Sequence, residues 1–211
     1  MPRMISLLLV LLGFFPAIAN AQSAPTQAEW LESMRLGGYV IVLRHGATTS
    51  DSAMDPMSNP AKKAAPSGER QLSEAGRAQA RAVGEALRKL KIPVSLVLTS
   101  PLQRAVDTGT LLGFGEVTIK PELAEAGSAL PAEENKHRAD ALRQLASMQP
   151  PPDNNLVIVT HKPNLIEAFG KDWSGIREGE ASVFEPDGTG GGYKLVLRIR
   201  AEEWGALQPT Q

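Results

Sequence analysis

The sequence predicts a single three-layer α/β/α domain with a mostly parallel central sheet and a C-terminal hairpin. Runs of apolar or β-branched residues, interrupted only at Ser95, cover residues 39–43, 94–99 and 156–160, as in strands buried on both faces of a parallel sheet. Segments with helical spacing of apolar residues lie between these runs. Two alternating runs near the C-terminal end are separated by glycine-rich residues, which favours a hairpin. The pattern is a β/α alternation closed by that hairpin.

Residues 1–21 have the features of a cleaved export signal. Arg3 provides a basic start, residues 5–15 are mostly apolar, and Ala19 and Ala21 suit a cleavage site. A membrane anchor is the alternative, but the apolar run is shorter than the roughly 20 residues of a spanning helix. We therefore expect removal of the signal, no membrane span afterwards, and one domain over residues 22–211, a length that is short for two.

The composition excludes several classes of function. Loss of Arg3 with the signal takes the formal net charge from −1 to −2, so no excess of positive charge points to nucleic acid. The chain has no cysteine, which excludes disulfides and cysteine-ligated zinc. The only histidines are His45, His137 and His161, and none has HxxxH or HExxH spacing. We expect no metal and no cofactor.

The N-terminal half of the domain is expected to begin with a short helix. Thr26 and Glu29 form a capping-box pattern, and the strand at 39–43 follows. Residues 47–71 are polar and lack a sustained period, so they predict a long loop of the kind that is usually functional or mobile. Ser73 is the expected cap of a helix that continues to about Leu90, before the strand at 94–99.

The C-terminal half continues the alternation. Ser100 and Pro101 predict a helix start, with the helix ending at about Leu112. Residues 124–136 are expected to be irregular. The remaining expected elements are strands at 117–120, 156–160, 181–185 and 193–199, and helices at 137–148 and 163–169.

Residues suited to chemistry follow three of the buried strands. They are Arg44 and His45 after the first strand, Ser100 to Arg104 after the second, and His161 after the third. In open α/β sheets, ligands bind beyond the carboxyl ends of the strands. Two arginines and two histidines in one crevice would form an electropositive pocket that fits a phosphate dianion.

Four segments in this frame carry a family resemblance. Residues 43–48 (LRHGAT) resemble an RHGxT signature and residues 72–80 (LSEAGRAQA) an LTxxGxxQA helix. Residues 100–105 (SPLQRA) resemble an SPxxRA segment and residues 159–161 (VTH) a VxH segment. With these motifs in order over about residues 39–199, the chain resembles the histidine phosphatase (phosphoglycerate mutase-like) superfamily, and in particular its exported bacterial phosphatases.

The resemblance implies a role for each site residue. His45 would accept the phosphoryl group as the nucleophile. Arg44, Arg104 and His161 would bind the non-bridging oxygens, and the hydroxyl of Thr48 could add a donor. Gly46 would let the backbone approach the phosphate and turn sharply after the strand.

A proton donor for the leaving group is the least defined part of the site. Glu125 matches an LxE pattern at residues 123–125, and Glu122 is the nearby rival. The alternative is that Glu125 is a solvated carboxylate in a loop and not a proton donor.

Phosphatase is favoured over mutase for two reasons. Export removes the protein from glycolysis, and the residues after Glu125 depart from the mutase segment. The chain is similar to bacterial periplasmic histidine phosphatases, a group that includes a lipopolysaccharide core heptose phosphatase. We therefore expect a periplasmic phosphomonoesterase whose partner is a phosphorylated small molecule or envelope glycan. A non-catalytic domain that binds a phosphate ligand and a phosphohistidine-protein phosphatase are the alternatives.

Overall fold

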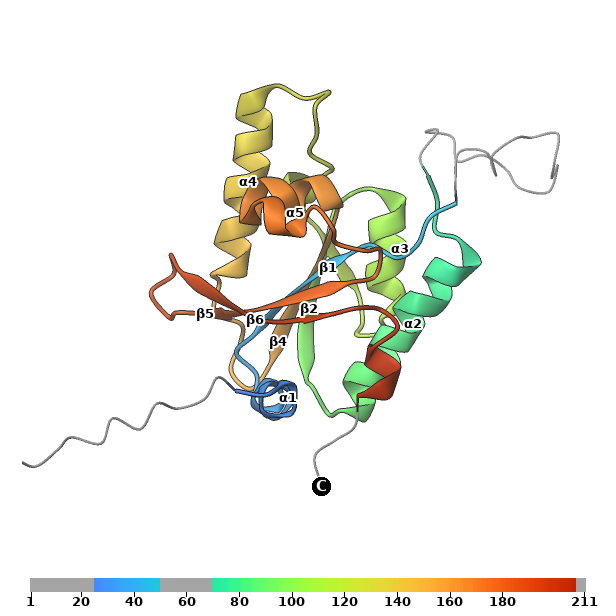
Figure 1. Ribbon diagram of the computed structural model, residues 1–211, viewed down its shortest axis with the longest axis vertical. Coiled ribbons are helices and arrows are strands. Elements are labelled where there is room, and N and C mark those ends of the chain that lie inside the picture. Colours follow the sequence, from blue (N-terminus) through green and yellow to red (C-terminus); the bar gives the residue numbers. More distant parts are fainter. Residues whose placement is uncertain (1–24, 50–69, 208–211) are drawn as a thin grey trace, which may run out of the picture.

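A six-stranded sheet forms the centre of the computed structural model, which describes residues 25–49 and 70–207 (Figure 1). The strand order is β3-β2-β4-β1-β5-β6. The first four strands in this order are parallel, and β5 is antiparallel to both β1 and β6. The strands are β1 (Val40–Arg44), β2 (Val94–Thr99), β3 (Val117–Ile119), β4 (Asn155–Thr160), β5 (Ala181–Pro186) and β6 (Tyr193–Ile199). The predicted mostly parallel sheet with a C-terminal hairpin is confirmed.

Both faces of the central strands are buried, which explains their continuous apolar sequences. In β1, Val40 and Val42 belong to one hydrophobic core, whereas Ile41 and Leu43 belong to the other. Side chains alternate between the two faces of a strand, so a strand covered on both sides needs an apolar residue at every position. β4 has the same arrangement and is buried throughout.

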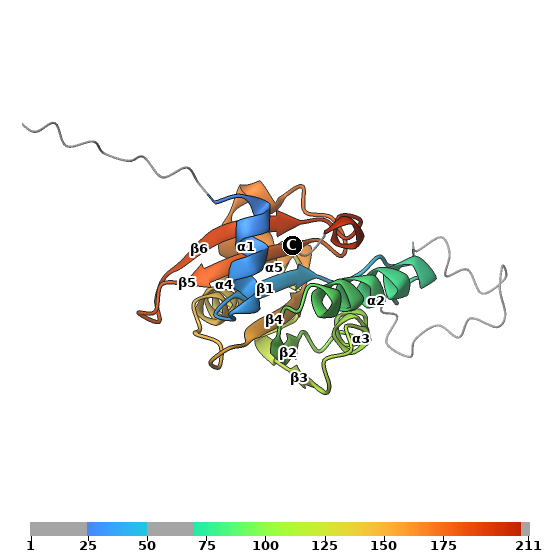
Figure 2. The same ribbon diagram turned by 90° about the horizontal axis from the view of Figure 1, so that it is seen from below.

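Helices cover both faces and complete the predicted three layers. One face packs against α1 (Gln27–Arg35), α2 (Glu74–Lys89), α3 (Gln103–Leu111) and the short turn η4 (Trp204–Ala206). The other face packs against α4 (Ala132–Ala146), α5 (Lys162–Phe169) and η3 (Lys171–Trp173). Figure 1 shows α4 and α5 above the sheet, α1 below it and α2 at its lower right, and Figure 2 gives the perpendicular view.

Two helix caps predicted from sequence are confirmed. The hydroxyl of Thr26 accepts from Glu29 N, and the Glu29 carboxylate accepts from Thr26 N. The hydroxyl of Ser73 accepts from Gly76 N at 3.0 Å and begins α2. Each cap satisfies backbone donors that the first helical turn leaves unpaired.

Two other helix starts were predicted wrongly. α3 begins at Gln103 instead of Ser100, because the Ser100 hydroxyl accepts from Leu102 N in a turn before the helix. α4 begins at Ala132, so the expectation of an irregular segment through residue 136 is wrong for residues 132–136. Pro131 stands at the N-cap, and Glu133 lies in the first turn, where a carboxylate favours helix formation.

The predicted N-terminal signal at residues 1–21 lies outside the described residues, and so do residues 50–69 of the predicted long loop. The described ends of the loop meet in an isolated antiparallel bridge between Thr48 and Leu72. Within residues 25–49 and 70–207, no helix has the length and apolarity needed to cross a membrane.

Candidate active site

The carboxyl ends of β1, β2 and β4 bring three predicted site residues together. β1 and β4 are parallel neighbours, with Arg44 opposite Thr160, so the residues that follow them are adjacent. The rings of His45 and His161 accordingly lie 5.2 Å apart between centroids. Arg104 reaches the same point from the start of α3, with its Nε 3.3 Å from His45 Nε2.

The hydrogen bonds of His45 define its tautomer. Nδ1 lies 2.8 Å from the carbonyl oxygen of Gly46. A carbonyl oxygen only accepts, so Nδ1 carries the hydrogen and Nε2 keeps a lone pair. Burial of this side chain, together with the nearby charges of Arg104 and Arg44, lowers the pKa of His45 to about 3. The imidazole is therefore neutral at pH 7.

His161 is also buried and presents one nitrogen without a partner. Its Nε2 lies 2.7 Å from the hydroxyl oxygen of Ser100. That oxygen also accepts from Leu102 N. In the tautomer in which the Ser100 hydroxyl donates to Nε2, the ring hydrogen lies on Nδ1. Nδ1 has no hydrogen-bond partner in the described part of the chain. Burial first, and then Arg104, lower the pKa of His161 to about 2.

Arg44 is held by the loop that precedes β5. Its Nη1 donates to Ile176 O at 2.9 Å, and its Nη2 lies 3.3 Å from a carboxylate oxygen of Glu178. The Thr48 hydroxyl donates to the same oxygen at 3.1 Å. Arg44 Nε is buried and unpartnered among the described residues. Glu178 thus links Arg44 to Thr48, whose contact with phosphate stays a prediction.

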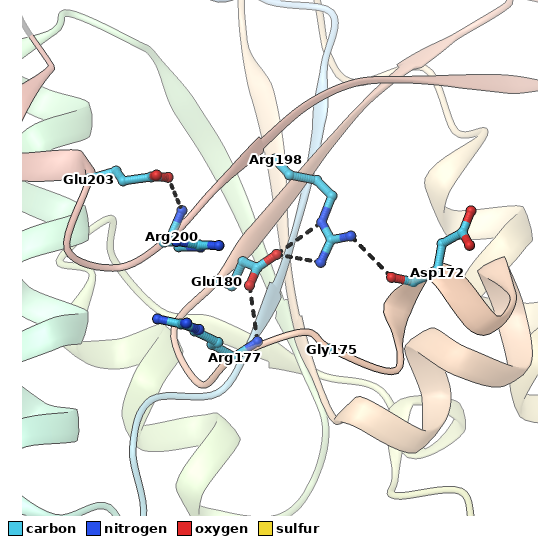
Figure 3. A pocket seen from close by; sticks show the side chains of 7 residues that line it. All are labelled: Asp172, Gly175, Arg177, Glu180, Arg198, Arg200 and Glu203. Carbon is cyan, nitrogen blue, oxygen red and sulfur yellow. Dashed lines mark hydrogen bonds and ion pairs between the residues drawn. The ribbon is translucent and has the colours of Figure 1, made fainter.

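The loop at 174–180 is anchored on its other side by a buried carboxylate. Glu180 accepts from Arg198 Nε at 2.9 Å and from Arg177 N at 3.0 Å, as Figure 3 shows. These residues line a cavity of about 420 Å³. The ion pair fixes the loop through which Glu178 and Ile176 hold Arg44.

The structure separates the two candidate proton donors. Glu125 follows η2 (Pro121–Leu123), and its carboxylate lies 2.6 Å from Nη2 of Arg104. Its side chain is 35% exposed, so a ligand can reach it from solvent. Glu122 instead lines a different cavity of about 550 Å³, with Lys120 and the turn between β5 and β6. Glu125 is therefore the acid that lies with the predicted phosphate ligands.

Close backbone packing explains two glycines of the motifs. A Cβ on Gly46 would lie 2.7 Å from Gly76 O, and a Cβ on Gly76 would lie 2.0 Å from Ala47 O. α2 therefore packs directly on the backbone that follows His45. The side chain of Gln79 reinforces this contact by accepting from Ala47 N at 2.9 Å. The close approach visible at Gly46 is to a helix, and the predicted approach to phosphate stays a prediction.

Other polar side chains complete the surroundings of the site. Thr108 on α3 accepts from Gly46 N at 3.1 Å through its hydroxyl. His137 is exposed on α4. Across the described ranges, no group of three or more His, Cys, Asp or Glu side chains is placed to hold a metal ion.

Neither Glu178 nor Thr108 was predicted as a site residue. Glu178 lies 134 positions from Arg44 in a charged loop, and no motif or period in that loop marks it. Thr108 lies four residues after Arg104 on the same helix, where the spacing places both side chains on one face. That spacing could have identified Thr108, whereas nothing in the sequence marks Glu178.

Comparison with known proteins identifies the class. The model of the histidine phosphatase superfamily (branch 1) matches residues 40–139. Residues 40–139 therefore belong to this superfamily, and the match supports a phosphatase enzyme. None of the curated proteins compared with the chain matches it.

Several solved structures have the same fold at low sequence identity. The protein histidine phosphatase SixA in complex with tungstate has a TM-score of 0.54 and 18% identity, over 78% of this chain and 98% of that one. The mycobacterial glucosyl-3-phosphoglycerate phosphatase in complex with VO3 has a TM-score of 0.51 and 20% identity, over 75% and 96% of the two chains. A candidate alpha-ribazole-5'-P phosphatase from Escherichia coli has a TM-score of 0.53 and 19% identity, over 77% and 98%.

Proposed function

We propose that this protein is a metal-independent phosphomonoester hydrolase that works through a phosphohistidine intermediate on His45. The state of the His45 ring is the observation that carries the proposal. Nδ1 donates to Gly46 O and burial keeps the ring uncharged, so Nε2 carries a lone pair, which accepts from Arg104 Nε in the ligand-free protein. A phosphate that binds Arg104 would free this lone pair to attack phosphorus. A residue with only a packing role would not need this tautomer.

The donors around Nε2 suit a phosphate dianion. Arg104 Nε points at His45 Nε2 itself. Arg44 Nε and His161 Nδ1 are buried and have no partner within the described ranges. A buried donor without a partner costs free energy, and a phosphate oxygen would supply the missing acceptor. Donors fixed in this way also stabilise the charge of the transition state.

The proposed reaction has two steps. First, Nε2 of His45 bonds to phosphorus as the ester P–O bond breaks, and the leaving alkoxide takes a proton from Glu125. The phosphorylated ring is cationic, and Gly46 O continues to accept from its Nδ1. Water then gives a proton to Glu125 and bonds to phosphorus as the P–Nε2 bond breaks. Inorganic phosphate leaves, and both side chains return to their initial states.

Substrate binding would release Glu125 for this role. In the ligand-free protein, its carboxylate pairs with Arg104. A bound phosphate would compete for Arg104 as a bidentate acceptor. The displaced carboxylate would take a proton from solvent and, as the carboxylic acid, would lie beside the ester oxygen, where that proton is required.

We propose a phosphorylated sugar of the cell envelope as the substrate and the periplasm as the location. The predicted export signal at residues 1–21 and the similarity to exported phosphatases support this choice. SixA is described as a protein histidine phosphatase, and the same nucleophile could accept a phosphoryl group from a protein histidine. Comparing kcat/KM for hexose and heptose phosphates with that for a phosphohistidine peptide distinguishes the two. We expect the sugar phosphates to be preferred.

Hydrolysis of p-nitrophenyl phosphate in excess EDTA tests the class of mechanism. We expect turnover to be unchanged by EDTA and inhibited by vanadate, which resembles the trigonal-bipyramidal transition state. Activity that requires an added divalent ion would contradict the proposal. Binding of vanadate without turnover would instead favour the non-catalytic phosphate-binding domain.

A further inference from the structure

The segment that carries Glu125 is held by side chains rather than by regular secondary structure. Residues 124–127 lie between η2 and α4, outside any helix or strand. Their backbone groups nevertheless have defined partners, because side chains of α4 and α5 reach them. The location of the Glu125 carboxyl group therefore depends on those side chains.

Asn164 makes the innermost of these contacts. Its Oδ1 accepts from Ala126 N at 3.0 Å, and its Nδ2 donates to Ala124 O at 2.8 Å. One amide thus holds the residues on both sides of Glu125. Asn164 is fully buried in α5, where asparagine is a weak helix former and an unpaired amide would be costly. The two bonds account for an amide at this position.

Two residues of α4 hold the outer side of the segment. Arg138 Nη1 donates to Glu125 O at 2.7 Å. Asn135 accepts from Gly127 N at 2.9 Å and donates to Gly127 O at 2.8 Å. Together with Asn164, these side chains fix successive peptide groups against the two helices of one face of the sheet.

We infer that Asn164 is a positioning residue that places the Glu125 carboxyl group for proton transfer. α5 begins immediately after His161, so one short helix presents both the proposed phosphate ligand and the residue that holds the acid. A displacement of the start of α5 would therefore move both His161 and the Glu125 carboxyl group. This inference rests on the proposed function, in which Glu125 protonates the leaving group.

The test uses two substrates that differ in their need for an acid. An alkyl phosphate requires protonation of its leaving group, whereas p-nitrophenolate leaves without it. For the full chain with Asn164→Ala or Asn164→Leu, we expect kcat/KM on the alkyl phosphate to fall about 10- to 100-fold, since small misplacements of catalytic groups have effects of this size. We expect less than about a threefold fall on p-nitrophenyl phosphate, because only proton transfer is impaired. The leucine variant keeps the number and branching of the side-chain heavy atoms while removing the amide.

Asn155→Ala is the matched control. Asn155 is also fully buried, and its amide bonds to Tyr39 N, Met34 O and Pro93 O at the opposite end of β4. This variant should lose stability but retain the wild-type ratio of the two activities. If the Asn164 variants lowered both activities equally, Asn164 would have only a structural role and the inference would be wrong.

Two further variants keep the outcomes distinguishable. Glu125→Gln should itself give the substrate-dependent loss. If Glu125→Gln gave no substrate-dependent loss of kcat/KM, the assignment of the acid in the proposed function would fail. If Glu125→Gln gave this loss and Asn164→Leu did not, only the inference about Asn164 would be overturned.

If the Asn164 variants did not fold, Arg138→Met would provide the test. It removes the bond to Glu125 O and should change the ratio in the same direction; an unchanged ratio would contradict the inference.

Discussion

At the scale of single residues, the site depends on which atoms of its side chains have partners. His45 donates from Nδ1 to the Gly46 carbonyl, and its Nε2 accepts from Arg104 Nε. His161 bonds to Ser100 through Nε2, and its Nδ1 has no partner among the described residues. A phosphate that binds Arg104 would free the lone pair of His45 Nε2, whereas His161 offers an N–H in the tautomer in which Ser100 donates to its Nε2. This difference supports giving them separate roles.

Glu125→Gln tests the proton donor. We expect alkyl phosphates to lose about 100- to 10,000-fold in kcat, the usual contribution of a general acid, and p-nitrophenyl phosphate to lose far less. Steady-state kinetics on the two substrates give the ratio. Glu122→Gln is the control, because Glu122 lines a separate cavity. Equal losses on both substrates in Glu125→Gln would mean that Glu125 binds or positions the substrate instead.

The sequence predicted some of the site residues better than others. Four site residues lie in short motifs at or after strand ends, namely Arg44, His45, Arg104 and His161. Their closeness to one another could be predicted, because the carboxyl ends of parallel strands meet at one edge of the sheet. Glu178 and Asn164 act through contacts across long sequence separations, at 134 and 40 positions. No local pattern records such contacts, so only the folded chain reveals them.

At the scale of secondary-structure elements, α2 supports the site through its backbone. A Cβ on Gly76 would lie 2.0 Å from Ala47 O. We expect Gly76→Ala to lower the free energy of unfolding by about 1–3 kcal/mol, typical of overpacking, and to reduce activity by displacing the backbone after His45. Chemical denaturation and p-nitrophenyl phosphate assays measure both effects.

Gly205→Ala is the control for this prediction. A Cβ at Gly205 would meet nothing within 4 Å, so the variant should resemble the wild type. Wild-type stability and activity in Gly76→Ala would show that α2 does not pack on this backbone as described.

Strands were predicted more accurately than helix starts. Each of the six strands lies within one residue of its predicted ends, because burial on one or both faces leaves a clear apolar pattern. α4 begins five residues before its predicted start, since residues 133–136 are all polar and the first turn of the helix leaves no apolar period. At Ser100, the hydroxyl that suggested a helix cap bonds to Leu102 N and lies beside His161.

At the scale of the whole molecule, the two buried histidines make stability depend on pH. The folded-state pKa values are about 3 for His45 and about 2 for His161, below the ordinary value of 6.5. Below pH 6.5, the unfolded chain binds protons that the folded chain does not. The stabilising contribution is therefore complete above that pH and is lost as pH falls towards 3.

Denaturation curves at pH 7, 5.5 and 4.5 test this dependence. Replacing His161 with Gln should reduce the loss of unfolding free energy on acidification, by up to about 1.4 kcal/mol per pH unit for one proton. His137→Gln removes an exposed histidine and should leave the slope unchanged. A wild-type slope in the His161 variant would contradict the neutral, buried state assigned to that residue.

Transfer of a radioactive phosphoryl group to the protein tests the central claim most directly. The protein would be incubated briefly with a ³²P-labelled phosphomonoester and quenched in base, because phosphohistidine is labile to acid. We expect acid-labile label on the wild type and on His161→Ala, with none on His45→Ala. Label that persists on the His45→Ala variant, or that resists acid, would contradict a phosphohistidine intermediate at His45.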